Sequence, residues 1–566
     1  MRSTVKERRE SIEMRHPIWE ETTLSVYLER AVDAFGERGL VVTDDETMNY
    51  RDVLDLSRRI AAGLEQKKLR PGDRVGIIMA NYPIIVPLLF AIWRQGLVAV
   101  PINTLYRAEE LSHVIRQSRC QYLITMAEFR GQDFLSHLDR MEPHWRSGVY
   151  EKSPDLKGIS VYGSACDSLT RFEELMAQGL LPAGQSECRA SAHDAAIIMY
   201  TSGTTGYPKG VILTHDNLLR SAYTVAYHHA FEDGRRAIFS LPMYHAYGVI
   251  HGLLAGLIVG GAMIPQLKFE PPAMLAGIGT HRASYLMAVP TMTLELLEEA
   301  KRRRYDFSSL RAVHNAAAPT PLWVWQEIRR TFGCNEIFTS YGQTETTAMI
   351  TGTLSEDPIE TISETQGLPA LGGVAGLPRL GRRIAEFKIV DPETGSERLP
   401  GQMGEICTRG PLNTRGYFEQ AEETAKLFLE GGWLRTGDLG VFRSDGYLTL
   451  TGRAKELYKS GGELVSPKEV EDLLTKHPDV SQAYVVGIPD EHWGESGCAW
   501  IIPSSGSDPC ANDIDSYLRQ NLARFKVPSR LYFIASDDLP KTGTGKVQKS
   551  VLRERAILRA NSAAIS

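Results

Sequence analysis

Cysteine is scarce in this sequence, and its positions exclude the structures that paired cysteines build. The chain of 566 residues has seven cysteines, none of them in a C-x-x-C pair: Cys120, Cys166, Cys188, Cys334, Cys407, Cys498 and Cys510. A disulfide framework or a zinc site needs paired spacing, so we expect free thiols in a reducing compartment. The charged N-terminus, residues 1–19, lacks the apolar core of a signal peptide, and we therefore expect a cytoplasmic location.

Long apolar runs are also missing. The stretch Pro83–Pro101 is interrupted by Arg94 and Gln95, and Gly248–Ile264 spans only 17 residues and contains His251. A membrane-spanning helix needs about 20 consecutive apolar residues. We therefore expect no transmembrane segment and predict that both stretches form buried helices and strands.

Positive charge is not in excess. The formal net charge is −6, whereas a general nucleic-acid binder needs clustered positive charge to neutralise phosphates. We therefore expect no nucleic-acid partner. Apolar residues make up 43% of the chain and charged residues 23%, which is ordinary for a globular protein. The length exceeds what one hydrophobic core usually supports, so two or more domains are expected.

The first 190 residues alternate helix-like and strand-like patterns. Apolar residues at helical spacing predict a helix over Tyr50–Lys67, followed by a strand over Val75–Met79. A helix over Pro83–Trp93 and a strand over Leu97–Ile102 come next. Strand, helix and strand with short joints are typical of a parallel sheet covered by helices.

The same alternation continues further along the chain and then changes. Strand-like segments recur at Val211–Leu213, Ala237–Leu241 and Tyr285–Val289. From about Ala385, short strands separated by glycine-rich turns predict a β-rich subregion. The sequence thus predicts a large N-terminal α/β domain with parallel βαβ sheets and a β-rich subregion.

A separate unit is predicted at the C-terminus. The strand Tyr447–Thr451 ends at a Gly-Arg pair, which we interpret as a linker. The helix Pro467–Lys476 and the strand Ala483–Val486 then begin a new compact unit. We predict a large domain over residues 1–451 and a smaller α+β domain over residues 452–566.

The sharpest local feature is the segment Ile197–Gly210, IIMYTSGTTGYPKG. Its glycines allow a close approach of the backbone to an anion, its hydroxyl groups can donate hydrogen bonds, and its lysine adds positive charge. A polyphosphate would suit such a loop, although the spacing is not that of a Walker A motif. Taken alone, the segment would also fit a polar surface turn between two strands. The residues concerned are Thr201, Ser202, Gly203, Thr204, Thr205, Gly206 and Lys209.

Five further motifs follow in order: PMYHAYG (242–248), YGQTE (341–345), TGD (436–438), GRAKELYKSGGE (452–463) and PKTGTGK (540–546). With the loop, they resemble the signature of the adenylate-forming superfamily, which includes acyl-CoA synthetases, peptide-synthetase adenylation domains and firefly luciferase. The resemblance covers roughly residues 45–550 and implies ATP, Mg²⁺ and coenzyme A as cofactor and co-substrates, with a small-molecule carboxylic acid as substrate.

The resemblance also implies roles for residues around the nucleotide. Glu345 matches the glutamate that holds the metal, with Thr204 beside it, and oxygen ligands suit Mg²⁺. Tyr341 matches the ring that stacks on adenine, and Thr344 the residue that contacts the α-phosphate. An ordinary solvated acid is the alternative for Glu345. The remaining nucleotide-binding residues implied are Ala318, Gly342, Gln343, Asp438 and Arg453, the last two at the ribose.

In the C-terminal domain, the resemblance makes Lys546 the lysine of the adenylation step, because it can reach both the attacking carboxylate and the α-phosphate. Lys455 matches the hinge about which a mobile C-terminal domain rotates between half-reactions. Ser460, Gly461 and Gly462 match the segment that lines a channel for CoA. On its own, the sequence around Lys546 would indicate a solvated lysine.

The segment 242–253 resembles the border of the acyl site, with His245, Tyr247 and Gly248 as candidates. It contains no acidic residue, which argues against an amino acid substrate. Ala316 and Ala317 stand where most relatives have glycine, and each added methyl group fills space beside the acyl tunnel. A medium-chain, branched, cyclic or aromatic acid is therefore favoured over a long straight chain. Metal binding by His245 and His251 is a weak alternative without a compact ligand set.

The predicted activity is that of an acid–thiol ligase, which forms acyl-CoA through acyl-AMP and is closest to short- and medium-chain or cyclohexanecarboxylate-type CoA ligases. An acyl-AMP ligase that loads an acyl carrier protein is the first alternative. A luciferase-like oxidase and a degenerate nucleotide-binding protein are others, although the latter would be expected to lose Glu345 or Lys546. A homodimer is compatible with the sequence.

Overall fold

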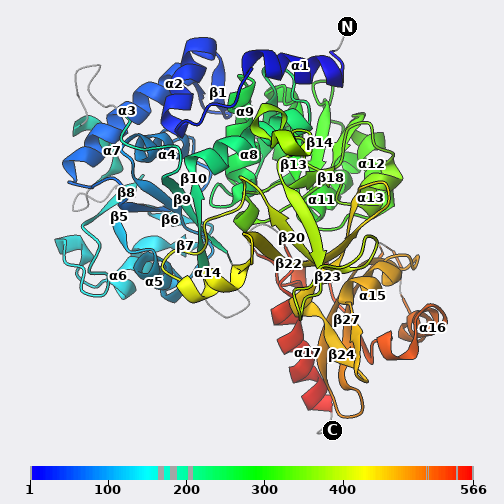
Figure 1. The fold of residues 1–566 in the computed structure, drawn as a ribbon. Helices are drawn as coiled ribbons and strands as arrows, with labels where there is room; N and C mark the ends of the chain where they lie inside the picture. Colours follow the sequence, from blue (N-terminus) through cyan, green and yellow to red (C-terminus); the bar gives the residue numbers. More distant parts are fainter. Residues whose placement is uncertain are drawn as a thin grey trace. The chain divides into compact units, whose positions relative to one another are not determined.

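The computed structural model describes residues 3–163, 171–178, 188–201, 208–504, 506–507, 509–542 and 546–563. Two compact units are distinguished (Figure 1). The first comprises Met1–Ser363, Gly367–Glu386 and Arg409–Leu434, and the second comprises Glu364–Gln366, Phe387–Thr408 and Arg435–Ser566. The compact units are defined by packing, whereas the predicted boundary after residue 451 lies at the Gly-Arg pair interpreted as a linker, and that boundary stays a prediction.

A seven-stranded sheet of the first unit has the order β15-β14-β13-β11-β12-β1-β2. All its pairings are parallel except that of β1 with β2. The parallel βαβ architecture predicted for the large domain is thereby confirmed. The strands are β1 (Gly39–Val42), β2 (Thr47–Asn49), β11 (Arg236–Phe239), β12 (Ala262–Pro265), β13 (Tyr285–Ala288), β14 (Ala312–Asn315) and β15 (Glu336–Phe338).

A second sheet, of six strands, has the order β10-β9-β4-β3-β5-β8. Its strands are β3 (Arg74–Ile78), β4 (Val98–Pro101), β5 (Cys120–Met126), β8 (Gly158–Tyr162), β9 (Ala195–Thr201) and β10 (Lys209–Thr214). β10 pairs antiparallel with β9, unlike the βαβ rhythm expected at Val211–Leu213. The reason is length, because a parallel return requires a crossover of a dozen or more residues.

Helices cover these sheets. The predicted helices are present as α3 (Tyr50–Gln66) and α4 (Ile85–Arg94), and Asn49 caps α3 by accepting a hydrogen bond from the Asp52 amide. Every residue of α4 is buried, which explains the apolar run there. The other helices of this unit are α1 (Val5–Arg15), α2 (Leu24–Phe35), α5 (Ala108–Gln117), α6 (Phe134–Met141), α7 (Phe172–Gln178), α8 (His215–His228), α9 (Ala255–Ile258), α10 (Pro271–Thr280), α11 (Pro290–Arg302), α12 (Leu322–Phe332), α13 (Ile359–Glu364) and α14 (Ala421–Leu427).

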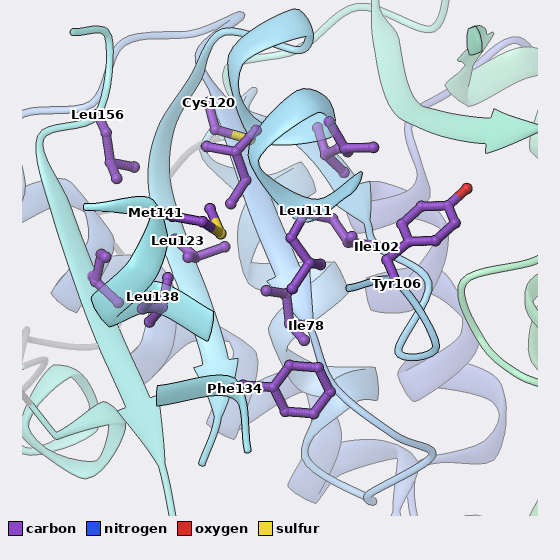
Figure 2. Close-up of a cluster of buried hydrophobic side chains, with 14 of the residues drawn as sticks. Ile78, Ile102, Tyr106, Leu111, Cys120, Leu123, Phe134, Leu138, Met141 and Leu156 are labelled. Atoms are coloured by element: carbon purple, nitrogen blue, oxygen red, sulfur yellow. The ribbon is translucent and has the colours of Figure 1, made fainter. Parts of the chain in front are cut away.

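One core of the first unit lies between the six-stranded sheet and helices α5 and α6. Figure 2 shows Ile78 of β3, Leu111 of α5, and Phe134 and Leu138 of α6 among its buried side chains. Leu111, Phe134 and Leu138 are each at most 1% exposed. Burying one such side chain contributes about 1.5–3 kcal/mol, so this core holds the sheet that carries the β9–β10 loop.

A β-rich subregion and a C-terminal α+β fold are both present, as predicted, but most of the β-rich strands are grouped with the second unit and not with the large domain to which the sequence assigned them. The β-rich part comprises β19 (Glu386–Val390), β20 (Gly404–Arg409), β22 (Trp433–Phe442) and β23 (Leu448–Arg453), in a sheet that also takes in β21 (Phe428–Leu429). The C-terminal part comprises β24 (Tyr458–Ser460), β25 (Glu463–Val465), α15 (Pro467–Leu474), β26 (Val480–Asp490), β27 (Gly494–Pro503), α16 (Ala511–Asn521), β28 (Arg530–Phe533) and α17 (Lys549–Ala563). Among the helices of the residues described above, none has both the length and the apolar character needed to cross a membrane.

Candidate active site

The hairpin β9–β10 carries the predicted phosphate loop. Thr201, the last residue of β9, lies opposite Lys209, the first residue of β10. The loop between them therefore begins and ends at one cross-strand pair. The predicted loop residues Ser202, Gly203, Thr204, Thr205 and Gly206 lie outside the described residues.

Glu345 lies in a tight turn that follows β16 (Ser340–Tyr341). Gly342 is required there, because a Cβ atom at this position would lie 1.4 Å from the Ala348 carbonyl oxygen. Thr347 and Ala348 have φ angles of 51° and 71°, in the left-handed region that costs L-residues energy. Such strain clusters at functional sites. Near Glu345, Tyr341 is buried, and Gln343 and Thr344 are partly exposed.

Tyr417 connects Glu345 with Lys209. Its hydroxyl group donates a hydrogen bond of 2.9 Å to Oε1 of Glu345, and Nζ of Lys209 lies 5.2 Å from the centre of its ring. Lys209 forms an ion pair with Glu423. We call Lys209, Tyr417, Glu345 and Glu423 the lysine–tyrosine cluster.

Backbone pairing places Tyr417 in this cluster. The Ile212 amide donates to the Gly416 carbonyl at 3.1 Å, and the Phe418 amide donates to the Gly210 carbonyl at 2.8 Å. The segment around Tyr417 thereby extends the edge of β10. No local sequence pattern indicates this pairing, and neither Tyr417 nor Glu423 was predicted from the sequence.

Lys209 of the lysine–tyrosine cluster is paired with a negative charge. Burial and the neighbouring Glu345 raise the pKa of Tyr417 well above its ordinary value, so its hydroxyl group stays protonated. Hydrogen bonds from Lys209 and Lys426 lower the pKa of Glu423 to about 2. Lys209 therefore faces an ionised carboxylate at neutral pH.

The predicted acyl segment forms a π-helix over Tyr247–Leu254. π-Helical turns are rare and frequently occur at functional sites. This turn brings Tyr247 and His251 together, with ring centres 4.9 Å apart, and His251 stacks on His314 of β14 at 4.9 Å. The Tyr247 hydroxyl lies 2.9 Å from Nδ1 of His314, whose Nε2 lies 2.9 Å from Oγ of Ser340. The structure thus links the predicted acyl segment to β14.

Burial keeps these histidines neutral. It lowers the pKa of His245 to about 4 and that of His251 to about 3. Burial also lowers the pKa of His314 well below its ordinary value, and the neighbouring His251 adds to this effect. Within the described residues, no group of three or more histidine, cysteine, aspartate or glutamate side chains could hold a metal ion.

The three alanines after β14 differ in environment. Ala316 is buried, whereas Ala317 and Ala318 are exposed. Ala317 has a φ angle of 75°, where glycine would be unstrained. Among these three alanines, Ala316 is therefore the one whose methyl group fills interior space. Gly248 is also constrained, because a Cβ atom there would lie 2.4 Å from the Pro242 carbonyl oxygen.

In the second unit, Asp438 of β22 and Arg453 of β23 lie opposite each other. Arg453 Nε donates to Oδ1 of Asp438 at 2.8 Å, and Asp438 is 5% exposed. Repulsion by Arg453, followed by burial, lowers the pKa of Lys546 to about 8. Because Lys546 is exposed at the surface, we regard the repulsion by Arg453 as the dominant cause. The structure thus brings together three predicted residues, Asp438, Arg453 and Lys546.

A second lysine of this unit behaves in the opposite way. Lys549, the first residue of α17, lies 2.9 Å from Oε2 of Glu456 and 2.7 Å from Oε1 of Glu471. These two carboxylates raise its pKa above the ordinary value despite burial. Lys549, Glu456 and Glu471, which we call the Lys549 triad, were not singled out from the sequence.

The remaining predicted residues lie in the segment from the end of β23 to the start of β25. Lys455 is exposed in a short 3₁₀ turn, Ala454–Glu456, next to Arg453. Ser460 ends β24, and Gly461 and Gly462 form the turn to β25 with φ angles of 61° and 87°. A Cβ atom on Gly461 would lie 2.7 Å from the Trp493 ring, so both glycines are needed for the hairpin itself. Their predicted role at a CoA channel stays a prediction.

Comparison with known proteins defines the family. Residues 28–418 match the AMP-binding enzyme family, and residues 469–546 match the AMP-binding enzyme C-terminal domain. The chain is 32% identical over 520 residues to the acyl-CoA ligase SID4 of Ajellomyces capsulatus, with 89% of this chain and 86% of that protein covered. It is 29% identical over 547 residues to the mitochondrial medium-chain acyl-CoA ligase ACSF2 of Danio rerio, covering 94% of this chain and 87% of that protein.

Among solved structures, the anthranilate CoA ligase AuaEII in complex with anthranoyl-AMP is similar, with a TM-score of 0.83 and 25% identity. The similarity covers 97% of this chain and 99% of that one. Fold and comparisons define an ATP-dependent ligase that joins a carboxylic acid to CoA through an acyl-AMP. The chain belongs to the AMP-binding enzyme family, as the sequence motifs predicted.

Proposed function

We propose that this ligase activates a medium-chain, branched, cyclic or aromatic carboxylic acid, with Lys546 as the cation of the adenylation step. The observation that carries the role of Lys546 is its position beside Arg453 and Asp438, the predicted ribose-binding pair. Lys546 itself follows a loop whose Thr542 amide donates to the Lys546 carbonyl at 2.7 Å.

The proposed adenylation is a displacement at phosphorus. A carboxylate oxygen of the acid attacks the α-phosphorus of ATP and forms a P–O bond, while the bond to the bridging oxygen of the β-phosphate breaks and pyrophosphate leaves. Lys546 neutralises the negative charge that builds up on the reacting oxygens. Such preorganised charge stabilisation is worth about 2.7–4 kcal/mol per donor.

Thioester formation follows at the acyl carbonyl. The sulfur of CoA attacks the carbonyl carbon, the bond to the AMP oxygen breaks, and the thiol proton passes to solvent. We further propose that the C-terminal domain rotates at Lys455 between the two half-reactions and then presents Ser460, Gly461 and Gly462 to CoA. A hinge needs only a few residues that absorb a change in φ and ψ.

Glu345 is the proposed residue for Mg²⁺, and its surroundings fit that role. It is 8% exposed, and the hydrogen bond from Tyr417 orients one carboxylate oxygen. Mg²⁺ is usually bound by one or two carboxylates together with substrate phosphates and water, so a larger cluster of acids is not required. When bound, the metal ion neutralises phosphate charge. Thr204, the second predicted ligand, lies outside the described residues.

The proposed acyl site consists of His245, Tyr247, Gly248 and Ala316, with Ala317 at its edge. Residues 242–253 contain no acidic side chain that could hold an α-ammonium group. The neutral His245 can donate a hydrogen bond to the substrate carboxylate, and the methyl group of Ala316 fills buried space. Medium-chain and aromatic acids are named as substrates for two similar ligases, which supports this choice.

The test is a screen of ATP–pyrophosphate exchange across medium-chain, branched, cyclic, aromatic and long-chain acids. The screen is repeated with CoA and with mass detection of the acyl-CoA product. We expect the shorter and ring-containing acids to exceed palmitate, and Ala316→Gly to raise the relative rate with palmitate. Turnover of palmitate by the wild-type enzyme at a rate equal to or above the others contradicts the substrate assignment.

A further inference from the structure

Lys209 forms an ion pair with a carboxylate of the protein itself, that of Glu423. Its ammonium group is paired with Glu423, and the two side chains are 13% and 29% exposed. Glu423 also lies 2.7 Å from Nζ of Lys426, which is 70% exposed. A mostly buried lysine without a counter-charge is costly, so the carboxylate stabilises the site in this state.

The rest of the cluster restricts where Lys209 can point. Its Nζ atom lies 5.2 Å from the centre of the Tyr417 ring, while the Tyr417 hydroxyl is engaged by Glu345. A ring face attracts a cation, and the hydroxyl group of this same ring holds Glu345, the glutamate that the proposed function assigns to the metal. Glu423 therefore neutralises the ammonium group of Lys209, the lysine that the sequence assigns to phosphate binding.

Helix α14 has a second carboxylate next to Glu423, that of Glu422, for which no contact with Lys209 is observed. Glu422 and Glu423 are consecutive in its first turn. Glu422 is exposed, whereas Glu423 is turned onto Lys209. The two residues have the same charge and are neighbours in the chain, but only Glu423 contacts Lys209. They are therefore a matched pair for an experiment.

We propose that Glu423 is an internal counter-ion that occupies Lys209 in the nucleotide-free enzyme and is displaced by the polyphosphate of ATP. This inference rests on the proposed role of Lys209 in binding phosphates. A carboxylate carries one negative charge and a polyphosphate several, so the exchange favours the nucleotide. The return of Glu423 to Lys209 then favours release of pyrophosphate. Glu423 acts through Lys209 and is thus a positioning residue.

The test is the affinity of the full chain for inorganic pyrophosphate and for ATP, measured by calorimetry without acid or CoA. Because Glu423 competes with the ligand, Glu423→Gln is expected to tighten binding by about two- to fivefold, the range for a partly exposed ion pair. Glu422→Gln makes the same change in net charge and is expected to leave binding unchanged. Weaker or unaltered binding by Glu423→Gln overturns the proposal, because a carboxylate with only a structural role would not oppose the ligand.

Two further variants separate competition from an effect on folding. Glu423→Asp keeps the charge and is expected to bind like the wild type. In a Lys209→Met background, Glu423→Gln is expected to have no effect, because the ion pair is already gone. A persisting effect there contradicts the proposal. Acyl-CoA formation by the wild type is assayed separately, so failure of the proposed substrate class leaves the binding result unaffected, and the reverse also holds.

Discussion

Each compact unit contains a lysine predicted to bind or stabilise negative charge, and the two lysines have opposite electrostatic surroundings. In the first unit, Lys209 is neutralised by Glu423. In the second unit, Asp438 forms an ion pair with Arg453. Arg453 repels the ammonium group of Lys546 more strongly than Asp438 attracts it, so the pKa of Lys546 is lowered. A neutralised lysine suits the exchange of one anion for another. A lysine whose positive charge is in excess suits the stabilisation of negative charge that develops during a reaction.

Removal of Lys546 is the strongest test of this contrast. Lys546→Ala is expected to lower the rate of ATP–pyrophosphate exchange by about 10²–10³, the usual effect of losing one charge-stabilising donor. Thioester formation from supplied acyl-AMP is expected to stay near the wild-type rate. Lys541→Ala, at the other end of the same loop, is the control. Exchange that survives the loss of Lys546 means that the lysine was wrongly assigned.

Lys549 tests whether a neutralised lysine contributes to stability rather than to chemistry. Lys549→Met leaves Glu456 and Glu471 without their cation, and we expect the free energy of unfolding to fall by about 2 kcal/mol in urea titrations at pH 7, the usual effect of losing a hydrogen bond to a charged group. The pKa of Glu456 is lowered from its usual 4.5, so its stabilising contribution is present above that pH and is lost as the pH falls through the folded-state value. The pKa of Lys549 is raised, so its contribution is lost only when the pH rises through its folded-state value.

The difference in the free energy of unfolding between wild type and Lys549→Met should therefore be largest near neutral pH and should become smaller in acid. Equal stability of the two proteins at pH 7 would show that the Lys549 triad contributes nothing. Lys476→Met removes a lysine of the same unit outside this triad and serves as the control for charge alone.

Tyr417→Phe tests the first-unit side of this comparison, in which Lys209 is neutralised. The variant keeps the ring beside Lys209 and loses the hydrogen bond to Glu345, at a cost of about 1–1.5 kcal/mol. We expect kcat/KM for ATP to fall about tenfold, since 1.36 kcal/mol corresponds to that factor. Tyr484→Phe, which removes a hydroxyl group in the second unit, is the control. Wild-type kinetics for Tyr417→Phe would remove Tyr417 from the site.

The smallest expected effect is a shift along the pH axis. In the proposed mechanism, adenylation needs protonated Lys546, so kcat/KM for ATP is expected to decline as the pH rises through about 8. Arg453→Gln removes the main cause of the lowered pKa, and the decline should move upward, toward the ordinary lysine value of 10.5. An unchanged midpoint in exchange assays from pH 6 to 10 would assign the decline to another group.

Much of the fold followed from local patterns. The helix predicted over Tyr50–Lys67 is present as α3, and the strand predicted over Val75–Met79 lies within one residue of β3. The apolar stretch after Gly248 was predicted to be buried, and it is, but its π-helical form was not foreseen. Hydrophobic periodicity reports which face of an element is buried, whereas an α-helix and a π-helix differ in their backbone hydrogen bonds, which this periodicity does not report.

For the candidate site, the sequence identified the motif residues and the structure supplied their partners. Glu345, Asp438 and Lys546 stand in short patterns whose chemistry can be recognised from residue types and order. No such pattern surrounds Tyr417, Glu423 or the Lys549 triad. Each of them is defined by a hydrogen bond or ion pair with a residue far away in the chain.

The sequence by itself determined the family, the two-part α/β and α+β organisation, and the residue types available for chemistry, since these depend on composition, periodicity and motif order along the chain. Only the tertiary structure decided which lysine is neutralised and which has its pKa lowered. The physical reason is that the electrostatic energy of a charged group depends on distances to other charges and on burial, and both are set by contacts between segments that the chain separates by tens or hundreds of residues.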